Sequence, residues 1–322
     1  MISLIIPHCN QLDDLLKLLR SIHDWELKPD EIVIVDSSVD ASQVNIKITS
    51  ILLKIGIKFQ LIHQNHAYPG AARNIGIRVS KGELLAFLDV KTIPQKKWLA
   101  SAMQKLSNHP DASGIYGGTQ YVATTYLSKT VRLATYGVSP LKTLPGSLLK
   151  RDVINITGQF IESTRAGEDT DWMARLNLHK LKIMNADSIL NYNGLDNLTL
   201  PQLLRKWYRN YKFAAKLPYQ FAHKNLYYHA LVFFLLLVAF NWNWIIAGWN
   251  QKSNLYIPHF TKIIFVLIVS FYIFVRSILM PMKKGASWSD LLPLKWLYVA
   301  VIGALLDVTK ILAFARGRWM RE

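Results

Sequence analysis

The chain has 322 residues, of which 51% are apolar and 18% are charged, and its formal net charge is +17. Soluble globular proteins carry about 25% charged residues, so this chain is unusually apolar, and it has too much apolar surface to be disordered. Its single cysteine, Cys9, excludes a disulfide framework and a cysteine-based zinc site, and it points to a reducing compartment.

Apolar runs alternate with helical patterns over the first 90 residues. The β-branched runs predict strands, and apolar residues at helical spacing predict helices. The expected strands are 2–6 (ending at Pro7), 31–35, 57–62 and 83–88, and the expected helices are 11–23 and 71–79. This order predicts an α/β fold with a mostly parallel sheet flanked by helices. Ligands of such sheets bind beyond the carboxyl ends of the strands, where Asp36 and Asp89 are expected.

An acidic cluster lies farther along the chain, directly before a helical pattern at 172–179. It comprises Glu168, Asp169 and Asp171. Carboxylates are common at a helix N-terminus because the helix dipole favours them, but a carboxylate can also act as a general base. Aspartates at strand ends have a similar alternative, since they also cap helices and turns. The residues alone leave both interpretations open.

The positive charge belongs to the C-terminal third, which is also strongly apolar. Residues 201–322 hold 16 Lys and Arg against 3 Asp and Glu. These cations flank apolar runs, so we expect an anionic membrane surface as the partner, and no nucleic acid. Within a membrane domain at 226–322, the runs at 226–248 and 257–280 are long enough to span a bilayer. A third helix at 291–316 contains Lys295, Asp307 and Lys310 before its terminal Arg316, and it is expected to be interfacial or spanning.

The basic clusters suggest an orientation in the membrane. With two spans and an interfacial third helix, the clusters at 205–224, 276–284 and 316–321 all face the cytoplasm, whereas three spans would place the last one outside. The start of the chain lacks the basic and long apolar regions of a signal peptide. We therefore expect a multi-pass protein of the plasma or inner membrane, with residues 1–200 in the cytoplasm and 201–225 as a basic, aromatic linker.

Four segments together resemble the family 2 glycosyltransferases. They are SLIIPHCNQLDDLLKLLRSI, EIVIVDSSVD, GAARNIGIRVSKGELLAFLD and GEDTDWMARL, and they come in the family's order and roughly at its spacing. The resemblance covers residues 1–200. It implies a GT-A fold and an inverting transfer of a sugar from a nucleotide-sugar donor.

The resemblance also implies roles for single residues. On the donor side these are Pro7, Asp36, Arg73, Asp89 and Lys91. Asp36 would meet the base or ribose, Arg73 the base or diphosphate, and Asp89 would help to bind Mg²⁺ or Mn²⁺ and the sugar diphosphate. In the acidic cluster, the resemblance implies Asp169 as the catalytic base, with Asp171 as the alternative beside Glu168.

One position departs from the family's D-x-D motif, which here reads Asp89-Val90-Lys91. Divalent cations prefer oxygen ligands, and a protonated lysine cannot be one. Asp89 could hold the metal with waters and the diphosphate, or Lys91 could neutralise the diphosphate directly. The third reading is an inactive relative that serves as a membrane-anchored binding or scaffold subunit.

Residues 202–207 (QLLRKW) are weakly similar to the Q-x-x-R-W motif of processive synthases, with one residue inserted. A cationic helix approaching a bilayer has the same composition. Arg205, Trp207 and Arg209 are therefore expected on the side of a lipidic or lipid-linked acceptor. Two or three membrane helices are too few for a polysaccharide channel unless the protein forms an oligomer. The sugar, the base, the acceptor and the linkage stay open.

Overall fold

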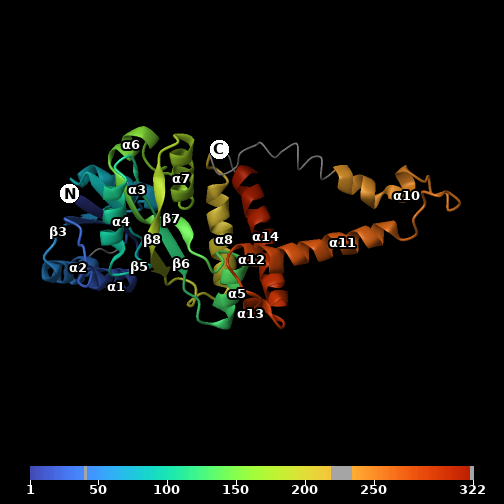
Figure 1. Cartoon of the computed structure of the whole chain (residues 1–322), viewed down its shortest axis with the longest axis horizontal. Coiled ribbons are helices and arrows are strands. Elements are labelled where there is room, and N and C mark those ends of the chain that lie inside the picture. Colours follow the sequence, from blue (N-terminus) through green and yellow to red (C-terminus); the bar gives the residue numbers. More distant parts are fainter. Residues whose placement is uncertain (40–41, 219–233, 320–322) are drawn as a thin grey trace.

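Figure 1 shows a computed structural model of the chain, in which residues 1–39, 42–218 and 234–319 are described. Within these residues one eight-stranded sheet has the order β3-β2-β1-β4-β7-β6-β8-β5. The strands are β1 (Ile2–His8), β2 (Glu31–Asp36), β3 (Lys58–His63), β4 (Leu84–Phe87), β5 (Thr92–Pro94), β6 (Gly114–Tyr121), β7 (Leu141–Lys150) and β8 (Ile183–Tyr192). The helices around it are α1 (Leu12–Ile22), α2 (Ser42–Ile55), α3 (Pro69–Val79), α4 (Trp98–Asn108), α5 (Tyr126–Ala134), α6 (Asp152–Thr157), α7 (Glu168–Leu178) and α8 (Leu200–Ala214).

Most strands of the sheet run in one direction. β1 pairs in parallel with β2 and β4, β2 with β3, and β6 with β8. β7 is antiparallel to β4 and β6, and β5 is antiparallel to β8, so among the described strands only β5 and β7 point the other way. The predicted α/β fold is confirmed. Because the other strands share a direction, the carboxyl ends of β1, β2, β4, β6 and β8 meet at one edge of the sheet.

Alternate residues of the central strand β1 face two separate cores, as the period of a strand requires. Leu4 and Ile6 pack into the core shared with α1, α2 and α4. Ile5 packs on the opposite face with Ile77 of α3 and Trp172 of α7. β1 is longer than predicted, since it continues past Pro7 to His8 in register with β2. Both cores therefore hold rigidly the strand ends at which the candidate site lies.

The C-terminal part is helical. It comprises α10 (Trp242–Ile245), α11 (Phe260–Phe274), the π-helical η2 (Val275–Leu279), α12 (Met280–Lys283), α13 (Trp288–Leu291) and α14 (Lys295–Trp319). α14 lies alongside α8 in Figure 1, and Val299, Ile302 and Leu306 of α14 share a core with Leu203 of α8 and Val131 of α5. The C-terminal helix is thus packed directly on the sheet domain's own helices.

Two helices are long and apolar enough to cross a membrane, at Phe260–Lys283 and Lys295–Trp319. None of the residues of α11 is buried, and Figure 1 shows this helix projecting away from α14. A helix that is apolar on every side needs apolar surroundings. These two helices are weak support for membrane association on their own, since length and composition alone define them.

The predicted membrane segments match the helices of the structure to different extents. Of the run at 226–248, residues 226–233 lie outside the described residues, and the helix described from 234 ends at Phe240. The Asn241 side chain and its backbone amide both donate to the Leu237 carbonyl, and the short helix α10 begins at the next residue, Trp242. The segment predicted at 257–280 is contained in the helix 260–283 apart from its first three residues.

The third predicted helix, 291–316, corresponds to α14, which begins at Lys295. One flank packs on α8 and α5, while Val301, Leu305 and Val308 are exposed on another flank. This is the arrangement expected for a helix that lies along a membrane interface. Whether α14 is interfacial or spanning stays a prediction.

Gly317 allows the close approach of α14 to α8. A Cβ atom at this position would lie 2.3 Å from the Lys212 carbonyl oxygen and 2.9 Å from the Ala215 Cβ. We expect Gly317→Leu to separate the two helices and to lower the free energy of unfolding by about 1–3 kcal/mol. Thermal unfolding in detergent measures this, with Val301→Leu on the exposed flank as the control. Equal stability of the two variants would contradict the close packing.

Candidate active site

Two predicted aspartates and two tyrosines share the carboxyl edge of the sheet. Asp36 ends β2, and Asp89 follows β4 by two residues. Tyr121 ends β6 and Tyr192 ends β8, and these two rings lie 4.7 Å apart between centroids. Since all four strands run in one direction, these side chains come from one side of the molecule although the chain separates them widely.

Arg73 of α3 joins this edge to the acidic cluster. Its Nη2 lies 2.9 Å from Asp89 Oδ1, and its Nη1 lies 2.6 Å from Glu168 Oε1. The neighbouring Asn74 exchanges two hydrogen bonds of 2.9 Å with the backbone of Phe160. One turn of α3 therefore fixes both the loop after β4 and the loop that leads into α7.

The guanidinium of Arg73 is buried, and this burial changes the pKa values of Arg73 and of its partner Glu168. Burial would lower the pKa of Arg73, but the charges of Asp89 and Glu168 raise it well above its ordinary value. Burial raises the pKa of Glu168 to about 7, while Arg73 opposes the rise and the charge of Asp169 adds to it. Glu168 therefore needs the guanidinium to stay ionised at neutral pH.

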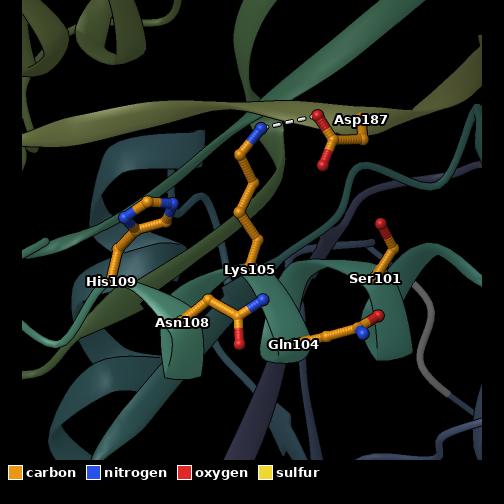
Figure 2. A pocket seen from close by; sticks show the side chains of 6 residues that line it. All are labelled: Ser101, Gln104, Lys105, Asn108, His109 and Asp187. Carbon is orange, nitrogen blue, oxygen red and sulfur yellow. Dashed lines mark hydrogen bonds and ion pairs between the residues drawn. The ribbon is translucent and has the colours of Figure 1, made fainter.

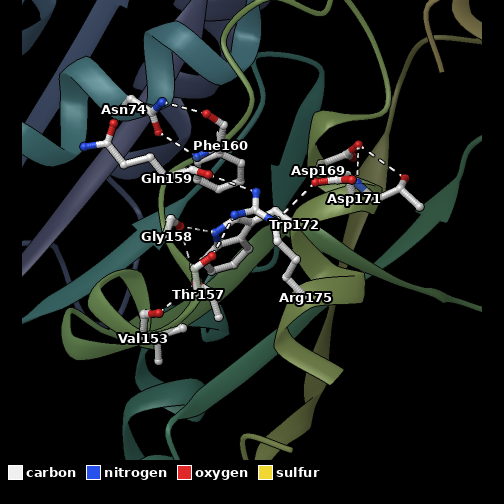
Figure 3. A network of polar contacts seen from close by, with 11 residues as sticks. Asn74, Val153, Thr157, Gly158, Gln159, Phe160, Asp169, Asp171, Trp172 and Arg175 are labelled. Atoms are coloured by element: carbon white, nitrogen blue, oxygen red, sulfur yellow. Dashed lines mark hydrogen bonds and ion pairs between the residues drawn. The ribbon is translucent and has the colours of Figure 1, made fainter. Parts of the chain in front are cut away.

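The acids of the first turn of α7 have different surroundings (Figure 3). Asp171 is fully buried and pairs with Arg175 at 3.2 Å, and Arg175 donates to the carbonyls of Thr157 and Gln159. Asp171 thus helps to hold the loop before α7 in place, and its role as the alternative base stays a prediction.

Asp169 is partly exposed, and its Oδ1 accepts a 2.7 Å hydrogen bond from the amide of Thr170. Burial raises the pKa of Tyr121 most, and the neighbouring Tyr136 and Tyr192 raise it as well. The negative charges of Asp169 and Asp89 make smaller contributions in the same direction. The carboxylate of Asp169 therefore acts electrostatically on the same tyrosine as that of Asp89. Of the acidic cluster, Asp169 is the member that a ligand at this edge can reach.

Asp36 is fully buried, unlike Asp89. It lies 2.8 Å from His8 Nδ1 and accepts a 2.6 Å hydrogen bond from the Ser38 hydroxyl, and Pro7 precedes His8 on β1. Burial would raise the pKa of Asp36, but the bonds from His8 and Ser38 outweigh it and lower the pKa to about 2. Asp36 therefore orders the ends of β1 and β2, and its contact with a base or ribose stays a prediction.

The surroundings of Asp89 bear on the expected metal. One oxygen of its carboxylate is already bonded to Arg73, and position 91 is a lysine whose Nζ lies 3.8 Å from Asp14 Oδ2. In the described ranges, His, Cys, Asp and Glu nowhere gather in a group of three or more that could hold a metal ion. This donor set does not fit a divalent cation that is held by the protein's own side chains.

Four aromatic side chains form a connected wall at this edge of the sheet: Tyr121, Tyr136, Tyr192 and Trp207. Tyr121 stacks on Tyr136 with ring centroids 3.7 Å apart, and Tyr136 lies 6.1 Å from Trp207 of α8. Lys206 Nζ lies 3.4 Å from the Tyr192 hydroxyl. The sequence patterns did not single out these tyrosines as site residues, although two of them stand at strand ends where ligands bind.

The three residues predicted on the acceptor side lie on α8. Trp207 belongs to the aromatic wall and stacks on Tyr211 at 5.5 Å. Arg205 and Arg209 are exposed. Although Arg209 is exposed, burial of part of its side chain and the charge of Arg165 lower its pKa. The C-terminal half of α8 therefore approaches the loop before α7, which carries Arg165. The structure brings Trp207 to the site and leaves Arg205 at the surface.

Gly70, at the start of α3, permits the approach of the loop before α7. A Cβ there would lie 2.3 Å from the Ile161 carbonyl oxygen and 3.3 Å from Glu168 Cγ. We expect Gly70→Ala to displace this loop and to lower kcat/KM by about 10²-fold, because small misplacements of reacting groups cost that much. In Gly118→Ala the nearest atom lies 3.6 Å away, so this variant is the control in the same assay. Full activity of Gly70→Ala would contradict the geometry.

A shallow pocket of about 280 Å³ lies elsewhere, on α4 and β8 (Figure 2). It is lined by Ser101, Gln104, Lys105, Asn108, His109 and Asp187. Lys105 and Asp187 pair at 2.5 Å across it. The pocket contains none of the predicted site residues, and its lining is polar surface of a single helix and strand.

Comparisons with known proteins bear on the whole site. Residues 3–161 match the family described as Glycosyl transferase family 2. Glycosyltransferase AglE of Haloferax volcanii is 24% identical over 189 residues, which cover 54% of this chain and 60% of AglE. EpsH of Bacillus subtilis, named as a glycosyltransferase, is 35% identical over 89 residues, which cover 27% of this chain and 25% of EpsH. The matches thus span less than two thirds of these curated relatives.

A solved structure shows the fold. Mannosyltransferase PcManGT from Pyrobaculum calidifontis, in complex with GDP-Man and Mn²⁺, has a TM-score of 0.55 and 14% identity, with 100% of this chain and 88% of that chain covered. At this identity the likeness concerns the fold, and it confirms the expected GT-A type. The family match includes the β1, β2 and β4 ends and Arg73. Residues 3–161 of this chain therefore form a glycosyl transferase family 2 domain.

Proposed function

We propose that this glycosyltransferase moves a sugar, with inversion, from a nucleotide-sugar donor to a lipidic or lipid-linked acceptor at the cytoplasmic face of a plasma or inner membrane. One observation carries the proposal. The Arg73 bridge between Asp89 and Glu168 holds the partly exposed Asp169 beside the carboxyl edge of the sheet. That edge is where ligands of parallel sheets bind.

The proposed chemistry needs a base on the acceptor. The Asp169 carboxylate accepts the proton of an acceptor hydroxyl, whose oxygen forms a bond to the sugar's anomeric carbon. The bond from that carbon to the phosphate oxygen breaks, and the nucleoside diphosphate leaves with the electron pair. Attack from the side opposite the leaving group inverts the configuration. A phosphate acceptor is already ionised and would need no base.

The lipidic acceptor rests on how the site is joined to the apolar helices. Trp207 belongs to the aromatic wall, and Lys310 of α14 lies 4.7 Å from its ring centroid. From α14 the chain presents exposed apolar side chains such as Val301 and Leu305, and α11 adds more. An acceptor with its tail in a membrane beside these helices would have its polar end near α8. Anchoring beside the acceptor raises its effective concentration.

Purified full-length protein in mixed micelles tests the proposal. UDP-, GDP- and dTDP-sugars are offered with a polyprenyl phosphate, a glycolipid or a water-soluble alcohol as the acceptor. We expect transfer from one donor class to a lipidic acceptor, with inverted configuration in the product by NMR. Transfer to the soluble alcohol at the same kcat/KM would contradict the lipidic acceptor.

The scaffold alternative is favoured by one observation, the lysine at position 91. A protein that kept the fold and lost its chemistry would show neither turnover nor binding of any nucleoside diphosphate. The same panel, with binding measured by calorimetry, separates that outcome from catalysis.

A further inference from the structure

Two lysines that are far apart in the sequence lie on segments that meet at Tyr192. The amide of Asn193 donates to the Lys91 carbonyl at 3.0 Å, and Thr92 pairs with Tyr192, so the loop after β4 is held against the end of β8. From the other side, Lys206 of α8 places its Nζ 3.4 Å from the Tyr192 hydroxyl and 5.7 Å from the ring centroid. Both lysines thus belong to segments at the carboxyl edge of the sheet, and the charge of Lys91 acts on Lys206.

Neither lysine is well neutralised by the protein. Lys91 has a long contact of 3.8 Å with Asp14. In the described part of the chain, no carboxylate lies within ion-pair distance of Lys206, although this side chain is partly buried. Burial, followed by the charges of Lys91 and Arg209, lowers the pKa of Lys206 to about 8. Desolvating a cation without a paired anion is costly, so a site with two partly buried lysines is suited to an anionic ligand.

Compared with the family's motif, this chain has a positive charge in place of a negative one at the position where a donor diphosphate would be bound. The family's motif has an acid at the position of Lys91, and the remaining acid, Asp89, is already paired with Arg73. A bound diphosphate would therefore lie near two ammonium groups, and the charge of Asp89 would already be balanced by the guanidinium of Arg73. The charge that a divalent cation would supply is present in side chains.

Resting on the proposed function, we propose that Lys91 and Lys206 bind the diphosphate of the donor and neutralise the leaving nucleoside diphosphate, so that transfer requires no divalent metal. As the bond from the anomeric carbon to oxygen breaks, negative charge gathers on the terminal phosphate. Two fixed cations stabilise this charge without rearrangement. The acceptor's proton goes to Asp169, so protons and charges balance without a further reactant.

Binding of UDP and GDP in EDTA is the first test, measured by calorimetry on the full chain in detergent. The wild type is expected to bind one of them equally, within twofold, in EDTA and in Mn²⁺. Lys91→Met and Lys206→Met are expected to weaken this binding about 10- to 100-fold, because bonds to charged groups are lost. Binding of the matching nucleoside, which lacks phosphates, is expected to stay unchanged. Lys216→Met, an exposed lysine just after α8, is the control.

Lys91→Asp is the complementary test, because it restores the family's second acid. We expect this variant to bind the nucleoside diphosphate weakly in EDTA and to recover at least about tenfold when Mn²⁺ is added, since two carboxylates can then hold the cation. Circular dichroism checks that the variant is folded. The wild type shows no such recovery.

The outcomes separate this inference from the proposed function. Loss of wild-type binding or turnover in EDTA, or wild-type affinity in Lys206→Met, would overturn the metal-free site while leaving a metal-dependent glycosyltransferase. Failure of the wild type to bind any nucleoside diphosphate, with or without Mn²⁺, would overturn the proposed function and this inference with it.

Discussion

Asp169→Asn is expected to lower kcat for transfer to a hydroxyl acceptor by about 10²–10⁴-fold, the range in which a general base contributes. The amide has the shape of the carboxylate but cannot take the acceptor's proton. Donor affinity is expected to stay within about threefold, because Asp169 makes no bond to Asp89; its neighbour Glu168 is the residue that Arg73 joins to Asp89. Steady-state kinetics and donor titration measure the two effects separately.

The control for this change is Asp111→Asn. Asp111 is exposed and pairs with Lys182 at the surface, so its loss is expected to change kcat less than twofold. A phosphate acceptor should show a much smaller effect of Asp169→Asn, because it brings its own negative charge. Unchanged kcat with a hydroxyl acceptor would remove Asp169 from the proposed role.

Arg73→Met is expected to cost both activity and stability. It leaves Glu168 buried without its cation, and breaking a buried ion pair on one side costs about 3–5 kcal/mol of unfolding free energy. The loss should depend on pH. Without Arg73, the pKa of Glu168 in the folded protein lies above its unfolded value, so the variant is destabilised as pH rises through that range. Its deficit relative to the wild type should be smaller at pH 5 than at pH 8.

The double variant Arg73→Met with Glu168→Gln is the control for the buried charge. It removes the uncompensated carboxylate, so chemical unfolding should show recovery of a large part of the lost stability at pH 8. Activity should not recover, because Asp89 and the loop before α7 have lost their link. Equal stability of Arg73→Met and the wild type at pH 8 would contradict the bridge.

Local patterns in the sequence predicted what local physics determines. The β-branched run at 31–35 and the apolar run at 83–88 became β2 and β4, and Asp36 and Asp89 followed from the strand ends. The acidic cluster forms the first turn of α7, where the helix dipole favours it. The match of several ordered segments then distinguished a family site from chance aspartates.

Contacts between distant parts of the chain were beyond such patterns. Arg73 and Glu168 are 95 residues apart, and nothing near either residue predicts their ion pair. Tyr121 and Tyr192 end strands whose glycines and polar residues hide the strand pattern. Asp171 was grouped with its neighbours by type, whereas helix rotation turns it inward toward Arg175. The packing of α14 on α8 likewise needed the three-dimensional structure.

Hydrogen exchange with and without a bound nucleoside diphosphate tests the central claim most directly, because it locates the donor without relying on turnover. We predict slower exchange in the segments 88–93 and 160–170 when UDP or GDP is bound, and unchanged exchange in α4, which carries the separate polar pocket. Protection confined to α4, with 88–93 and 160–170 exchanging as in the free protein, would contradict the placement of the active site at the edge joined by Arg73.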